Sequence, residues 1–264
     1  MGSTEIDYLG VLDYLQENRE LPYMDPDKVE GDERAHFLEM KKNGDHAVGE
    51  LKRLSDICEN KYALRLVTNI SWLLAGSKTR KTLSVQMKYP EYEEEPAFVA
   101  VYVEYDEELG ARYRVGLDIK NDVADKKTME QYHSFLNLPI DKGSGLIYVV
   151  KTNKWGNPIP IDQSRESLRG AVNSHEMAKV QICSYVKDYA SNDEYSEALL
   201  AAVENILPYY EHVIGAEDYR KHILDDVEDD KAAWSESMNR ISKNTILYGP
   251  PGTGKTYNTL AFSI

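Results

Sequence analysis

Cysteine is scarce in this chain, and its scarcity excludes several kinds of architecture. Cys58 and Cys183 are the only two cysteines among 264 residues, which gives neither a disulfide framework nor the paired spacing of a zinc site. The six histidines show no HExxH spacing and no neighbouring cysteine pair. We therefore expect neither a disulfide-stabilised fold nor a zinc centre.

Long hydrophobic runs and a targeting segment are missing as well. No stretch of the sequence approaches the run of about 18 apolar residues that a membrane helix needs. The first residues, MGSTE, lack the basic start and apolar stretch of a secretory signal. These absences predict a cytoplasmic protein that does not cross a membrane.

A basic excess is absent too. The chain has 31 Lys and Arg against 45 Asp and Glu, a net charge of -14. This balance excludes nucleic-acid binding through a general basic coat. Any contact with a nucleic acid would have to be local.

Apolar periodicity predicts helices at the start of the chain and at its centre. Residues 3–18 place Ile6, Leu9, Leu12 and Leu15 three apart behind a Ser/Thr start, as in an amphipathic helix. The chain from 25 to 76 continues in helical periods with Gly44 and Gly76 as punctuation, which predicts two or three helices. Further helices are predicted at residues 125–136, at 164–172 and from 192 to about 214, the last capped by Asn192 or Asp193 and kinked or ended at Pro208.

Alternating apolar and β-branched residues predict strands between these helices. The predicted strands are residues 82–89, 97–106, 112–120 and 144–152, with a hairpin loop at 107–111. Residues 178–187 fit neither the helical nor the strand period and stay open. Residues 1–214 are therefore predicted to form an α+β domain with helices around a small antiparallel sheet.

The chain changes character after residue 214. Residues 215–243 carry an acidic cluster of Asp225, Asp226, Glu228, Asp229 and Asp230 and lack strand patterning. This composition predicts an acidic helical linker. Residues 244–264 then predict the first strand and phosphate-binding loop of an incomplete α/β P-loop NTPase domain.

The strongest motif lies in this last segment. The residues that match G-x-x-x-x-G-K-[ST] are Gly249, Pro250, Pro251, Gly252, Thr253, Gly254, Lys255 and Thr256. Its glycines let backbone amides turn towards phosphate oxygens, Lys255 reaches the β and γ phosphates, and the hydroxyl of Thr256 holds Mg²⁺. A short apolar strand at 245–248 precedes the loop and a helical stretch follows it, so that the helix presents its positive end to the anion.

GPPGTGKT resembles the Walker A loop of AAA+ ATPases, and LYGPPGTGKTYNT, with an aromatic residue after the threonine, is similar to McrB-like proteins. The resemblance implies a hexameric motor subunit of a modification-dependent DNA restriction system that binds ATP or GTP with Mg²⁺. It also implies an N-terminal domain that recognises DNA and a separate nuclease subunit as partner.

Two alternatives stay open beside this interpretation. An AAA+ ATPase with an N-terminal domain that binds a protein partner fits the acidic balance. A superfamily 1 helicase also uses GPPGTGKT, but its adenine-reading glutamine should lie shortly upstream, and the nearest one here is Gln181. Because the Walker B acids would follow Ile264, we expect the chain to be cut just after Walker A, with no catalytic residue and no tight nucleotide binding of its own.

Candidate DNA contacts in the first domain are few. Lys151, Asn153, Lys154 and Trp155 combine cations, an amide and an indole after a predicted strand, which suits phosphate contact and base stacking. The basic stretch at 78–81 would add phosphate contacts if the fold brought it near Lys154. Strand alternation places Tyr102 and Tyr105 on opposite faces, so the two cannot line one base pocket.

Overall fold

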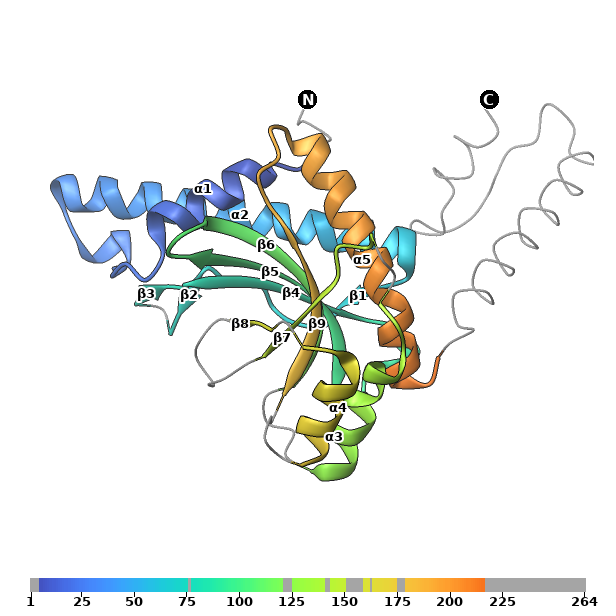
Figure 1. Cartoon of the computed structure of the whole chain (residues 1–264). Coiled ribbons are helices and arrows are strands. Elements are labelled where there is room, and N and C mark those ends of the chain that lie inside the picture. The colour runs from blue at the N-terminus through green and yellow to red at the C-terminus, as the bar shows by residue number, and fades with distance from the viewer. Residues whose placement is uncertain are drawn as a thin grey trace, which may run out of the picture. The chain divides into compact units, whose positions relative to one another are not determined.

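Helices precede, interrupt and follow a set of strands (Figure 1). The structure is a computed structural model that describes residues 5–75, 77–120, 125–140, 143–150, 159–161, 163–174 and 179–216, all of them in one compact unit. Its helices are α1 (Tyr8–Asn18), η1 (Pro26–Lys28), α2 (Gly31–Tyr62), η2 (Pro90–Tyr92), α3 (Lys126–Tyr132), η3 (His133–Asn137), α4 (Arg165–Asn173) and α5 (Asn192–Ile214). Its strands are β1 (Arg65–Leu66), β2 (Leu73–Leu74), β3 (Lys78–Thr79), β4 (Thr82–Lys88), β5 (Ala97–Asp106), β6 (Gly110–Ile119), β7 (Ile147–Val150), β8 (Ile159–Pro160) and β9 (Val180–Val186).

Seven of the strands form one sheet in the order β1-β4-β5-β6-β9-β7-β8, and each neighbouring pair is antiparallel. Strands β2 and β3 form a separate hairpin. The predicted α+β class with an antiparallel sheet is confirmed in these general terms. The open segment at 178–187 proves to be a strand, β9, inserted between β6 and β7.

The centre of the sheet is the β5–β6 hairpin, which the sequence predicts well. Each residue from Ala97 to Asp106 pairs with a residue from Gly110 to Ile119. The carboxylate Oδ1 of Asp106 accepts the amide hydrogens of Glu108 (3.0 Å) and Leu109 (3.1 Å), and Gly110 takes a positive φ of 74°. The turn is therefore fixed by its own side chain and by a residue that tolerates the left-handed conformation.

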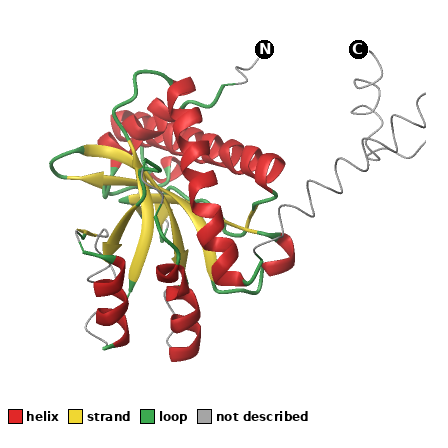
Figure 2. Ribbon diagram, turned by 45° about the vertical axis from the view of Figure 1, so that its right-hand side comes forward, coloured by secondary structure: helices red, strands yellow, loops and turns green. Residues whose placement is uncertain are grey.

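Helices α1 and α5 cover one face of β5 and β6, and α2 packs on α1 and β4. The rings of Tyr8, Tyr113 and Tyr195 meet there with centroids 5.7–6.4 Å apart. Aliphatic core side chains on this side include Leu15, Leu51, Leu54, Val85, Val99, Val101, Val103, Val115, Leu199, Val203 and Ile206. The short helices α3 and α4 lie at the other end of the sheet from α1 (Figures 1 and 2).

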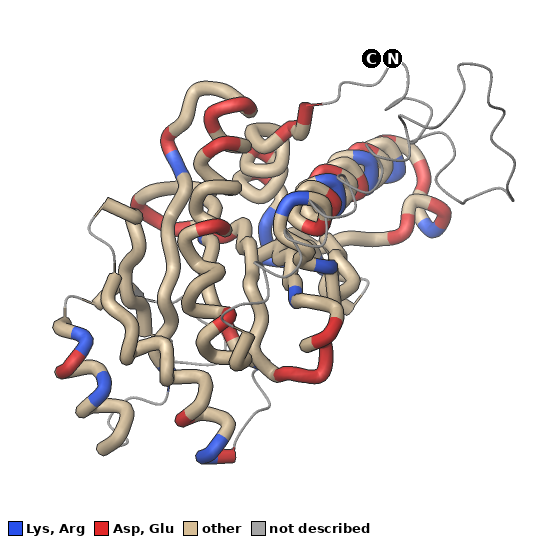
Figure 3. Tube along the Cα trace, turned by 90° about the vertical axis from the view of Figure 1, so that its right-hand side faces the viewer, with Lys and Arg blue, Asp and Glu red and all other residues tan. Residues whose placement is uncertain are grey.

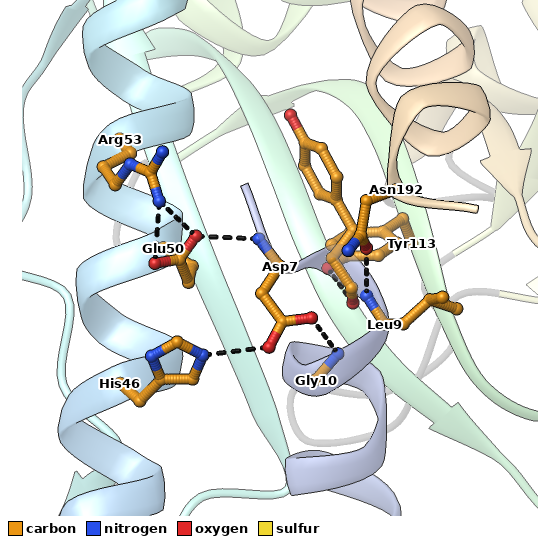
Figure 4. Close-up of polar contacts among 9 residues, drawn as sticks. Asp7, Leu9, Gly10, His46, Glu50, Arg53, Tyr113 and Asn192 are labelled. Atoms are coloured by element: carbon orange, nitrogen blue, oxygen red, sulfur yellow. Dashed lines mark hydrogen bonds and ion pairs between the residues drawn. The ribbon is translucent and has the colours of Figure 1, made fainter. Parts of the chain in front are cut away.

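Helix α1 begins at Tyr8 rather than within the predicted Ser/Thr start, and its cap is Asp7. The backbone amide of Asp7 donates to Glu50 of α2 (2.8 Å), and its carboxylate lies 3.0 Å from Nε2 of His46 (Figure 4). The amide of Leu9 donates to the side-chain oxygen of Asn192 in α5 (2.9 Å). The first turn of α1 is thus tied to both neighbouring helices, which explains why the helix starts there.

Two predictions for residues 25–76 are wrong. Helix α2 runs without a break through Gly44, and the residues that follow Ala63 form strands instead of another helix. Gly44 serves close packing rather than a turn, because a Cβ there would lie 2.4 Å from Cδ2 of the Trp72 indole. The helix ends when Ala63 adopts a left-handed conformation with φ 58°. Gly76 lies outside the described residues.

The prediction for α5 is also corrected in two details. Its cap is Ser191, which forms a capping box with Glu194, whereas Asn192 binds α1. The helix continues through Pro208 to Ile214. Buried Leu207, Tyr209 and Tyr210 surround the proline, so the packing of this turn outweighs the lost backbone hydrogen bond.

Candidate functional site

Charged and polar side chains occupy the face of β5 and β6 opposite to α1 and α5. The register pairs Tyr102 with Arg114 and Glu104 with Arg112. Since alternate residues of a strand share a face, these four residues lie on one side with Asp118, and Tyr113 lies on the other. Strand β9 adds Gln181, Cys183 and Tyr185, and Lys179 comes directly before that strand. We call this set of residues the charged face.

Glu104 binds two arginines in the interior of the protein. Its Oε1 accepts from Nη2 of Arg112 (3.2 Å), and its Oε2 accepts from Nε of Arg114 (2.9 Å). The exposed fraction is 1% for the Glu104 side chain, 6% for Arg112 and 4% for Arg114. Burial alone would lower the pKa of Arg114, but the carboxylate of Glu104 outweighs it and raises that pKa.

Each guanidinium also stacks on a tyrosine ring. Arg114 lies 4.2 Å from the ring centroid of Tyr102, and Arg112 lies 3.9 Å from that of Tyr185. Such cation–π contacts add to the ion pairs and fix the planes of both arginines. The orientation of the two cations is therefore set by β5 and β9 together.

A second group surrounds the carboxylate of Asp118. Tyr102 donates its hydroxyl to Oδ2 (2.6 Å), the amide of Ile119 donates to Oδ1 (2.7 Å), and Lys179 forms an ion pair. Burial favours a raised pKa for Asp118, yet Lys179 and these hydrogen bonds outweigh it and lower the pKa. Asp118 therefore remains ionised as the anion of a buried ion pair.

Strand β9 contributes polar groups that no described residue satisfies. Both side-chain amide atoms of Gln181 and the hydroxyl of Tyr185 are buried without a hydrogen-bond partner. Such groups are rare in native structures and bind water or a ligand when either is present. Cys183 lies between them, and burial raises the pKa of its thiol to about 12, so it is protonated and a poor nucleophile near neutral pH. These groups suit binding rather than covalent chemistry.

His133 supports the start of β9, and its lowered pKa makes the stability of the protein depend on pH. Its Nε2 accepts the amide hydrogen of Val180 (3.1 Å), and burial lowers its pKa to about 4. An unfolded histidine titrates near pH 6.5, so between pH 6.5 and 4 the unfolded chain binds the proton first. We expect stability to fall over that window, by about 2 kcal/mol at pH 5.

Urea unfolding of the wild type and of His133→Gln at pH 7 and pH 5 measures this contribution. The glutamine oxygen can accept the same amide hydrogen but does not titrate, so the variant should lose less stability on acidification. Equal losses in the two proteins would contradict the assignment, because all the other titrating groups are shared.

Most of the residues that the sequence singled out are not among the described residues. Lys151, Asn153, Lys154, Trp155 and the predicted phosphate-binding loop at 249–256 are outside the described residues, and of the predicted linker at 215–243 only Gly215 and Ala216 are described. The predicted separation of Tyr102 from Tyr105 is confirmed: Tyr102 binds Asp118 on the charged face, whereas Tyr105 stacks against Arg19 of the α1 region.

The basic stretch at 78–81 is partly occupied by contacts within the protein. Lys78 forms an ion pair with Glu20 (3.4 Å), and Nε of Arg80 donates to the carbonyl of Leu73 (3.0 Å). Thr79 is buried in β3. Figure 3 shows acidic and basic residues interspersed along α2 as well. Neither the basic stretch at 78–81 nor α2 therefore presents a uniformly basic surface.

The charged face is not among the sites predicted from the sequence, although part of its pattern is visible there. In RYRVGLDI, Arg112, Arg114 and Asp118 alternate with Tyr113, Val115, Leu117 and Ile119. Charged residues at every second position of an apolar strand indicate one polar and one apolar face. Lys179 comes from a distant segment, and no local pattern indicates that it binds Asp118.

No protein-family model, curated protein or solved structure matches the chain. Within the described residues, no group of three or more His, Cys, Asp and Glu is arranged to hold a metal ion. No described helix is long and apolar enough to cross a membrane. The motif at 249–256 and the charged face are therefore the features of this chain that bear on its function.

Proposed function

We propose that this chain belongs to a McrB-like AAA+ motor subunit of a modification-dependent DNA restriction system. Residues 249–256 bind ATP or GTP, and the α+β domain that precedes them recognises DNA. The observation that carries the proposal is GPPGTGKT after a short apolar stretch and before a stretch that is predicted to be helical. In this arrangement Lys255 neutralises the β and γ phosphates, and the hydroxyl of Thr256 is a ligand for Mg²⁺.

Two features of the described residues support a recognition role for the first domain. The carboxylates of Glu104 and Asp118 are held in buried ion pairs, so neither is poised to act as a general base. The amide of Gln181 and the hydroxyl of Tyr185 keep unused hydrogen-bonding capacity. Such groups can recognise a ligand without transforming it.

Replacing Lys255 by Ala tests the nucleotide site. The protein is expressed as its gene encodes it, with any residues that follow Ile264, and is titrated with fluorescent ATP and GTP analogues in the presence of Mg²⁺. We expect the variant to bind nucleotide at least about tenfold more weakly, because the ammonium group that meets the terminal phosphates is lost. Lys243→Ala, which removes the same charge outside the motif, should bind like the wild type.

The wild type, Lys255→Ala and Lys243→Ala are then titrated with modified and unmodified DNA duplexes over a salt series. DNA affinity that falls with salt and survives Lys255→Ala is expected if the first domain makes the contact. Full nucleotide affinity in Lys255→Ala would exclude the proposed nucleotide site. Absence of DNA binding at low salt would remove DNA as the ligand of the first domain.

A further inference from the structure

A cavity of about 470 Å³ opens beside the tip of the β5–β6 hairpin. Residues 19–20, Lys81 and residues 105–108 line it. Its walls therefore come from the end of α1, the segment before β4, and the hairpin itself. The volume lies in the range of sites that accept a small molecule or a few side chains.

The walls of this cavity are fixed by contacts within the protein. Asp106 holds the turn through its two accepted amide hydrogens and forms an ion pair with Arg112 (3.3 Å). The hydrogen bond from the backbone amide of Glu108 is the main cause of the lowered pKa of Asp106, and the positive charge of Arg112 lowers this pKa further. The amide of Ala111 donates to Gln16 of α1 (3.2 Å), which attaches the hairpin to that helix. A rigid site loses less entropy when it binds a partner.

The aromatic wall already carries one cation. The guanidinium of Arg19 lies 3.4 Å from the ring centroid of Tyr105 and also donates to the carbonyl of Gln16 (2.9 Å). Arg19 and Tyr105 thus already form a cation–π pair within the lining of the cavity. Four acidic residues line the cavity against two basic ones.

Glu20 and Asp106 of the lining form ion pairs with Lys78 and Arg112, whereas the other two acidic residues do not pair with a described residue. Glu107 and Glu108 are exposed, and neither forms an ion pair with any described residue. Leu109, next to Glu108, is 49% exposed, and Leu21, next to Glu20, is 37% exposed. The cavity lining thus includes two exposed glutamates without an ion pair among the described residues, and Leu21 and Leu109 are the chain neighbours of the lining residues Glu20 and Glu108.

We propose that this cavity and its two leucines form a docking site for a protein segment that carries Lys or Arg between apolar residues. A basic side chain enters the cavity beside Glu107 and Glu108, and its apolar neighbours cover Leu21 and Leu109. Charge complementarity selects this partner over a nucleic acid, because the unpaired carboxylates repel phosphates. The inference stands apart from the nucleotide site and from DNA recognition by the domain.

The test uses the full chain and a labelled synthetic peptide of alternating leucine and arginine. Fluorescence anisotropy compares the wild type with Glu107→Gln/Glu108→Gln and with the control Glu93→Gln/Glu94→Gln. The control removes the same charge from exposed residues beyond the other end of β5, roughly 30 Å away. We expect about tenfold weaker binding for the first double variant and less than about twofold for the control.

Two results would overturn the proposal. Equal weakening by both double variants would mean that the peptide responds only to the net charge of the chain. Displacement of the bound peptide by a DNA duplex in the wild type, but not in Glu107→Gln/Glu108→Gln, would assign the cavity to nucleic acid instead. A peptide in which glutamate replaces arginine should not bind any of the three proteins.

Discussion

Replacing Glu104 by Ala is expected to lower the free energy of unfolding by about 3–5 kcal/mol. The change leaves the guanidinium groups of Arg112 and Arg114 buried without the carboxylate that both of them share. An arginine cannot relieve this by losing its proton, since its pKa lies far above neutral. Arg112 keeps Asp106 as a partner, whereas Arg114 loses the only ion pair described for it.

The matched control is Glu59→Ala, which breaks an ion pair of similar geometry at the surface. There Nε of Arg65 lies 3.1 Å from Oε1 of Glu59, with side chains 55% and 45% exposed. Exposed pairs contribute about 0–1 kcal/mol, so this change should cost less than about 1 kcal/mol. Urea denaturation measures both variants. Similar losses in the two would mean that burial adds nothing to the Glu104 network.

The sheet could be predicted from the sequence where one strand carries its own pattern. Residues 97–106 alternate aromatic and β-branched side chains, and β5 has the same bounds. The short turn that follows restricts β6 to an antiparallel partner in nearly fixed register. Residues 178–187 gave no clear period because β9 is buried on both faces and includes Gln181 and Cys183 among apolar residues.

The charged face could be predicted only in part, for a related reason. Hairpin pairing brings Glu104 opposite Arg112, a relation that follows from the chain between them. The ion pair between Asp118 and Lys179 joins residues 61 apart, and the contact of Arg112 with the ring of Tyr185 depends on β9 entering beside β6. Long-range contacts of this kind are set by topology, and local sequence does not encode them.

At Gly44 of α2, a contact with a residue distant in the sequence outweighs the local helical preference. Glycine disfavours helix formation by about 1 kcal/mol relative to alanine, which is why the sequence suggests a break there. In the structure, a Cβ at residue 44 would lie 2.4, 2.6 and 2.8 Å from three ring atoms of Trp72. The glycine is thus required by the indole, which packs against the helix backbone.

We expect Gly44→Ala to destabilise the protein by about 2–3 kcal/mol, because the added methyl group displaces the buried ring of Trp72. The free energy lost by this displacement exceeds the gain from the higher helical preference of alanine. Movement of Trp72 would also strain its hydrogen bond to Asp45 (2.8 Å) and its contact with Tyr23. Gly49→Ala in the same helix has no atom within 4 Å of the new Cβ and should stabilise the protein by about 0.5–1 kcal/mol. Thermal unfolding followed by tryptophan fluorescence compares the two. The same sign of effect at both positions would mean that Trp72 does not require a glycine at position 44.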